Sequence, residues 1–204
     1  MYNAYPSGYA SYTERCGAFK TDILKQILII TIMFSFFGCN NKTEELPYFG
    51  TITLSNTRDY EVDNIKINDN NVSIDLNFEL DKINRKTLSN VRSILENLES
   101  IDKQNQNKFR NYISEDGMVR EYYNFYIEGY DSKQLNDYLK KADQNLPMEL
   151  RLLNATKLKR VGIYPYSPSF FAVLDYKVFD EYSDQILVVV LNEKGEIEKI
   201  TVES

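Results

Sequence analysis

The chain has 204 residues, and its 24 Lys and Arg against 30 Asp and Glu give a net charge of −6. An acidic surface repels phosphate backbones, so the composition predicts no nucleic-acid partner. The sequence contains no histidine, which excludes the commonest general base and the usual ligand of zinc, iron and copper. Every glycine beyond residue 38 is isolated, so no phosphate-binding loop is present. We therefore predict no catalytic residue, no metal site and no cofactor.

The N-terminal part of the chain contains one unbroken apolar run, Ile27–Phe37. As a helix this run would cover roughly 16 Å, about half of the hydrocarbon core of a bilayer, so it is too short to span a membrane. Lys20 and Lys25 precede it and form a positive n-region. Residues 20–38 are therefore predicted to be a signal peptide, and residues 1–19 a disordered extension or a start codon assigned too early.

The residues SFFGC, which end this segment, resemble the lipobox of bacterial lipoproteins. The resemblance implies that Gly38 flanks the cleavage site and that lipid on Cys39 holds the mature chain at a membrane of the cell envelope. The residue that follows the cysteine is Asn40 and not an aspartate. By analogy with other lipoproteins, this favours the outer over the inner membrane. The alternative is an uncleaved N-terminal anchor or a buried helix over residues 23–38.

The remaining chain is long enough for one domain. Removing residues 1–38 leaves 166 residues with a net charge of −7, enough to bury about 70% of the unfolded surface. Residues 39–46 are polar and lack hydrophobic periodicity, so they are predicted to form a tether, and residues 47–204 a single domain. Cys39 is then the only cysteine, and no internal disulfide can form.

Alternation of apolar and polar residues predicts strands at both ends of this domain. Gly50–Ser55 predicts a half-buried strand, and residues 62–78 predict a β-hairpin that turns at residues 68–71. Ile186–Leu191 is continuously apolar, as in a central strand, and precedes a turn and a last strand. Two further strands are predicted at residues 158–163 and 170–178, the second with one face made of Phe170, Ala172, Leu174, Tyr176 and Val178.

Between these strands the apolar period changes to three or four residues. The pattern predicts an amphipathic helix over residues 85–102, a shorter helix that ends near Gly117, and a helix over Met118–Glu128. Asp131 and Gln134 have the spacing of a capping box that begins another helix, and residues 146–153 predict one or two more turns. The order of elements predicts an α+β fold, with a mostly antiparallel sheet built from N-terminal and C-terminal strands and a central block of helices packed on one side.

Four segments carry a second resemblance. They are FGTITL around Gly50, VGIYP at Val161–Pro165, FAVLDYKV at Phe171–Val178, and DQILVVV with the closing GEIEKITVES. They are similar to an uncharacterised bacterial family, catalogued as domain of unknown function two thousand and four. The similarity covers about Pro47–Ser204 and implies the fold, but because that family has no established activity it implies no catalytic residue.

A non-catalytic binding module is the function that these features predict. Tyr164 and Tyr166 flank a proline in a predicted loop, and surface tyrosines offer large, rigid contact area to a protein or glycan partner. The aromatic segment at residues 121–130 has the spacing of a buried helical stripe instead. An acidic domain without an enzyme motif is typical of an immunity or inhibitor protein that binds a basic toxin, and membrane attachment would come from the lipid on Cys39.

A carboxylate-based hydrolase that acts on envelope glycans is the alternative. Such enzymes need two acids that face one another across a sugar at roughly 5 to 10 Å. Asp175 and Asp184 are the acidic candidates, and Asp175 on a strand could have a raised pKa through desolvation. The other interpretation of Asp175 is a cross-strand ion pair with Lys177, Lys159 or Arg160.

Overall fold

The computed structural model describes residues 43–115, 117–167, 169–180 and 182–204, which belong to one compact unit. The predicted extension over residues 1–19, the predicted signal peptide and the predicted lipidation site Cys39 lie outside these ranges. Among the described residues, no helix is long and apolar enough to cross a membrane.

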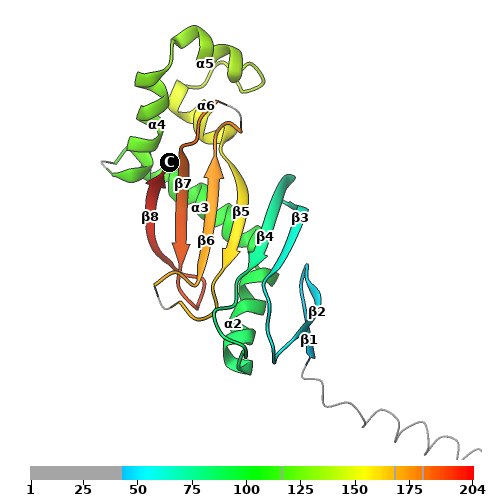
Figure 1. Ribbon diagram of the computed structural model, residues 1–204. Helices are drawn as coiled ribbons and strands as arrows, with labels where there is room; N and C mark the ends of the chain where they lie inside the picture. The colour runs from blue at the N-terminus through cyan, green and yellow to red at the C-terminus, as the bar shows by residue number, and fades with distance from the viewer. Residues whose placement is uncertain (1–42, 116, 168, 181) are drawn as a thin grey trace, which may run out of the picture. The chain divides into compact units, whose positions relative to one another are not determined.

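The fold is α+β, as the sequence predicts (Figure 1). A six-stranded sheet has the strand order β3-β4-β5-β6-β7-β8, and β1 pairs with β2 in a separate two-stranded sheet. In chain order the described elements are β1 (Thr43–Leu46), β2 (Gly50–Thr53), β3 (Tyr60–Ile67), β4 (Asn70–Leu76), α2 (Arg85–Glu96), α3 (Leu98–Tyr112), α4 (Met118–Gly129), α5 (Ser132–Tyr138), α6 (Met148–Ala155), β5 (Lys157–Ile163), β6 (Ala172–Lys177), β7 (Ile186–Leu191) and β8 (Ile197–Glu203).

Strand pairing in the large sheet is antiparallel except between β4 and β5, which are parallel. A parallel pair needs a crossover connection, and the connection between β4 and β5 contains all five described helices. The predicted hairpins are confirmed as β3–β4 and β7–β8. Asn68 and Asp69 make the first of these turns with positive φ angles of 45° and 68°, a conformation that Asn and Asp tolerate better than most residues.

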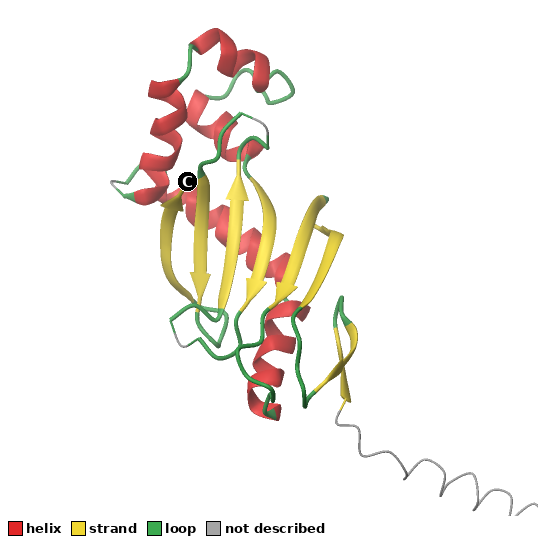
Figure 2. Cartoon of the chain, in the orientation of Figure 1, coloured by secondary structure: helices red, strands yellow, loops and turns green. Residues whose placement is uncertain are grey.

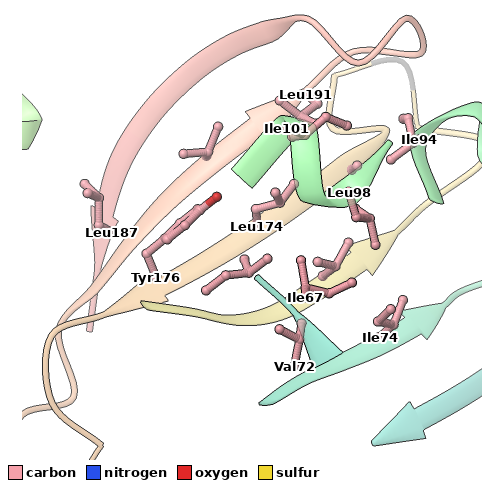
Figure 3. Packing of buried hydrophobic residues seen from close by; sticks show 14 of the residues in the cluster. Ile67, Val72, Ile74, Ile94, Leu98, Ile101, Leu174, Tyr176, Leu187 and Leu191 are labelled. Carbon is pink, nitrogen blue, oxygen red and sulfur yellow. The ribbon is translucent and has the colours of Figure 1, made fainter. Parts of the chain in front are cut away.

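Helices α2 and α3 lie behind the large sheet, and α4, α5 and α6 lie toward and beyond one of its ends (Figures 1 and 2). The other face of the sheet, which we call the open face, is not covered by a described helix (Figure 2). Ile94 from α2 and Leu98 and Ile101 from α3 point toward the sheet residues of the main core, among them Leu174 and Tyr176 (Figure 3). The core therefore lies between this helical layer and one face of the sheet. The open face carries both polar side chains, such as Asp175, and the valines Val173, Val188 and Val190.

The first helical segment differs from the prediction. A single residue, Asn97, separates α2 from α3, and α3 then continues to Tyr112 where a gap between two helices was predicted. The Asn97 side chain donates a hydrogen bond to the Ser93 carbonyl at 2.7 Å, which competes with the regular helical pattern. The predicted helix ends at residue 102 because the apolar period stops there: the next buried residues of α3, Asp102 and Asn105, are polar.

The chain before β2 also differs from the prediction. Thr43–Leu46 is a strand that pairs with β2, whereas the sequence predicts a tether over residues 39–46. Leu46 is buried in the main core cluster, and Glu44 accepts a hydrogen bond from Arg92 of α2 at 3.3 Å. A single buried leucine between polar residues gives no periodicity, which is why the sequence pattern does not reveal this strand.

Candidate binding surface on the open sheet face

Three neighbouring strands bring one arginine and two aspartates together on the open face. Arg160 of β5 lies opposite Asp175 of β6, and Asp75 of β4 lies opposite Gly162, two residues further along β5. The Arg160 guanidinium donates to both oxygens of Asp75, with Nε–Oδ1 2.7 Å and Nη2–Oδ2 2.9 Å. Its Nη1 donates to Asp175 at 3.1 Å and its Nη2 to the Tyr164 hydroxyl at 2.9 Å. We call Asp75, Arg160, Tyr164 and Asp175 the open-face cluster.

Charge in the open-face cluster is partly shielded from water. The side chains of Asp75 and Asp175 are each 16% exposed, and that of Arg160 is 39% exposed. Burial raises the pKa of Asp175, although the hydrogen bond and the charge of Arg160 act in the opposite direction. Burial alone would lower the pKa of Arg160, but its hydrogen bonds to Tyr164 and Asp75 outweigh this effect and raise it. The cluster is therefore a preformed ion triad with a net negative charge.

Gly162 makes room for this arrangement. A Cβ atom at this position would lie 2.9 Å from Arg160 Nη2, 2.9 Å from Tyr164 Cε2 and 3.0 Å from Tyr164 Oη. Side-chain atoms do not approach a real Cβ so closely, so any larger residue would push the guanidinium and the phenol ring away from the sheet. The glycine lets both side chains lie flat against the backbone of β5.

We expect Gly162→Ala to lower the free energy of unfolding by about 1–2 kcal/mol, because the added methyl group displaces Arg160 and Tyr164. Gly129→Ala is the matched control, since nothing lies within 4 Å of a Cβ built at that helical position. It should leave stability unchanged or raise it by up to about 1 kcal/mol. Urea denaturation of both variants measures the difference, and equal effects would contradict the packing described for Gly162.

An exposed aromatic side chain extends the open-face cluster. Phe170 packs edge-on against Tyr164, with ring centroids 5.4 Å apart, and remains 42% exposed. The prediction that Phe170 lies on one strand face with Ala172 and Leu174 is wrong: the strand begins at Ala172, and Phe171, not Phe170, is buried. The alternation of β6 does not extend into the loop before the strand. The sequence pattern therefore could not show which of the two phenylalanines is buried.

The two tyrosines predicted to bind a partner have different environments. Tyr164 belongs to the open-face cluster, whereas Tyr166 packs against the main core, and its hydroxyl donates to the Lys82 carbonyl. Burial raises the pKa of Tyr166. Tyr166 therefore fixes the loop in place, and among these two residues only Tyr164 contributes to the open-face cluster.

The two acidic candidates are not a pair that faces one site. Asp184 is exposed in the loop before β7, where its charge acts on Tyr126. The carboxylate that shares a partner with Asp175 is Asp75, which the sequence analysis did not select. Its polar position within the alternating segment VSIDLNF shows that it points away from the core, but not which strand lies beside it. The predicted ion pair of Asp175 with Arg160 is present.

Cavities described in the structure lie elsewhere. One of about 420 Å³ is lined by residues of α3, α4 and β8, including Tyr112, Met118 and Ile200. Three others, of about 290 to 410 Å³, are also lined by residues other than Asp75 and Asp175. Within the described ranges, no group of three or more acidic or cysteine side chains is placed to hold a metal ion.

The predicted buried stripe of α4 is confirmed at Tyr122 and Tyr126, but its other two members, Phe125 and Gly129, are exposed. Tyr122, Tyr123 and Tyr126 of α4 are buried, while Phe125 is 43% exposed. Helix α4 is at the opposite end of the sheet from the β5–β6 loop, which contains Phe170 (Figure 1). Phe125 and Phe170 thus have almost equal exposure on different surfaces, which makes one a control for the other.

Comparison with known proteins gives no match: no family model, no curated protein and no solved structure matches this chain.

Proposed function

We propose that the chain is a lipid-anchored lipoprotein of the cell envelope whose α+β domain is a non-catalytic binding module. Lipid on Cys39 attaches it to a membrane, and the open-face cluster with Phe170 binds a protein or glycan partner. The proposal of an immunity-like or inhibitor-like role follows from the acidic charge of the domain, which favours a basic partner.

The observation that carries the binding proposal is the preformed surface of Arg160, Tyr164 and Phe170 on a face that no described helix covers. Aromatic and arginine side chains dominate the energy of protein interfaces. The two aspartates and Gly162 already hold the arginine and the tyrosine in one arrangement. Little side-chain entropy would therefore be lost when a partner binds.

Hydrolysis by paired carboxylates has less support from the same geometry. Asp75 and Asp175 both accept hydrogen bonds from Arg160, so the guanidinium lies where a sugar would have to enter between two acids. A general acid also has to be protonated near neutral pH. Burial raises the pKa of Asp175 in that direction, but direct contact with Arg160 opposes the shift.

The test is capture of an envelope partner by the lipidated protein, with the captured species identified by cross-linking and mass spectrometry. Phe170→Ser should weaken capture by roughly 30-fold, as for an interface residue worth about 2 kcal/mol. Phe125→Ser removes a phenylalanine of equal exposure from another surface and should leave capture unchanged. If both variants capture the same species as well as the wild type, the open-face binding site is wrong.

The lipid anchor has its own test, intact mass of the protein from a lipoprotein-processing bacterium. The wild type should be truncated before Cys39 and acylated, and Cys39→Ser should be neither. A full-length, unmodified wild-type chain would contradict the anchor without affecting the binding site.

A further inference from the structure

The link between the proposed lipid and the folded domain is short. Only three residues, 40–42, separate Cys39 from Thr43, where β1 begins. Even fully extended, the chain from Cys39 to Thr43 covers at most roughly 14 Å. Whatever part of the domain lies next to Thr43 must therefore stay close to the acyl chains.

The neighbourhood of Thr43 is defined by backbone contacts. Thr43 pairs with Thr53, the last residue of β2. The segment that follows β2 is joined to the loop after β4, because Ile83 N donates to the Leu54 carbonyl at 3.3 Å and Thr57 N to the Asp81 carbonyl at 3.2 Å. The loop at residues 77–83 is therefore at the same end of the domain as the start of β1 (Figure 1).

The most exposed large apolar side chain of this end is Leu80. It is 56% exposed, and the Thr57 hydroxyl donates to its carbonyl, which fixes the loop backbone. The loop between β5 and β6 is adjacent, because Asn77 N donates to the Ile163 carbonyl at 2.8 Å and Tyr166 reaches the Lys82 carbonyl. The open-face cluster and Phe170 thus lie beside the same end.

Charge at this end has no single sign. Lys82 and Arg85 are close in the chain to Glu79 and Asp81. Attraction to anionic lipid is therefore not what would hold this end of the domain at a membrane. The short link and the exposed leucine are what would hold this end at a membrane.

We infer that the loops at residues 54–59 and 77–83 face the bilayer, with Leu80 in its interface. The inference rests on the proposed lipid on Cys39. Tyr164 and Phe170 lie beside this end of the domain. In this orientation the open face meets a partner that is itself embedded in or bound to the same membrane.

The experiment uses acylated protein reconstituted into phosphatidylcholine vesicles that contain a spin-labelled lipid as quencher. A fluorophore is attached at Leu80→Cys or, as the matched control, at Tyr182→Cys. Tyr182 is 48% exposed and lies in the β6–β7 loop at the opposite end of the sheet. The label at residue 80 should lose most of its fluorescence, and the label at residue 182 should keep it. Adding anionic lipid should change neither result.

A flexible insertion of about 15 Gly and Ser residues between residues 42 and 43 should restore the fluorescence at residue 80, since the longer link releases the domain from the surface. If acylation is confirmed by mass but both labels are quenched equally or not at all, the inferred orientation is wrong while the anchor stands. If the mass shows no acylation, the anchor and the orientation both fail.

Discussion

Arg160→Met should lower the free energy of unfolding at neutral pH by about 2–3 kcal/mol. The substitution keeps most of the aliphatic packing but leaves Asp75 and Asp175, which are largely shielded from water, without a counter-charge. Removing one member of a fully buried ion pair costs about 3–5 kcal/mol. We expect less here because the Arg160 side chain is 39% exposed, so water and ions screen the remaining charges.

The loss should depend on pH in a defined direction. Burial already raises the pKa of Asp175, and the charges of Glu203 and Asp75 raise it further, while Arg160 lowers it. Without Arg160 the folded-state pKa of Asp175 must rise. A carboxyl whose folded-state pKa lies above its unfolded value stabilises the fold below the unfolded pKa, and this contribution is lost as the pH rises through the folded value. The destabilisation by Arg160→Met should therefore be smaller near about pH 4 than near about pH 7.

Urea denaturation at the two pH values measures this change, and Lys159→Met is the control. Lys159 precedes Arg160 in β5 and pairs at 2.7 Å with Asp180, whose side chain is 64% exposed. Loss of this surface pair should cost less than about 1 kcal/mol at either pH. Equal effects of the two substitutions, or a loss with Arg160→Met that does not vary with pH, would show that the open-face cluster is an ordinary surface ion pair.

Much of the fold follows from local patterns in the sequence. Alternation predicted the strands of the large sheet, and the continuous apolar segment Ile186–Leu191 is a strand with a paired neighbour on each side. The capping box of Asp131 and Gln134 begins α5 as predicted, with both of its hydrogen bonds formed. These features depend on residues close together in the chain, which is why a single sequence reveals them.

Buried polar residues explain where the helix prediction failed. Asp102 accepts a hydrogen bond from Asn68 at 2.9 Å, and Asn105 donates one to the Tyr176 hydroxyl at 2.9 Å. Both residues lie on the buried face of α3, where a periodicity argument expects apolar side chains. Their partners come from β3–β4 and β6, so only the tertiary structure shows that this face is buried.

Only part of the candidate site could be predicted, because the missing part again depends on the tertiary structure. The ion pair of Asp175 with Arg160 joins consecutive strands, and the sequence offered it as one of three pairings. Asp75 approaches Arg160 through the parallel pairing of β4 with β5, which are separated by the whole helical block. Local patterns carry no information on that strand order, so the second carboxylate of the cluster could not be predicted.

Leu46→Ala should lower the free energy of unfolding by about 2–4 kcal/mol, the range for removing most of a buried leucine side chain from a core. Leu46 pairs with Gly50 and belongs to the main core cluster together with Ile52 and Leu54. A residue in a solvated tether would contribute nothing measurable. Urea denaturation of the chain with this single substitution therefore distinguishes a strand from a tether.

Thr43→Ala is the matched control, because Thr43 is an exposed residue of the same strand and should change stability by less than about 0.5 kcal/mol. If Leu46→Ala were as neutral as Thr43→Ala, the link from Cys39 to the core would extend past residue 46. The longer link would let the domain turn freely at the membrane. The strength of β1 packing thus determines both the stability of the domain and how closely the proposed lipid restrains it.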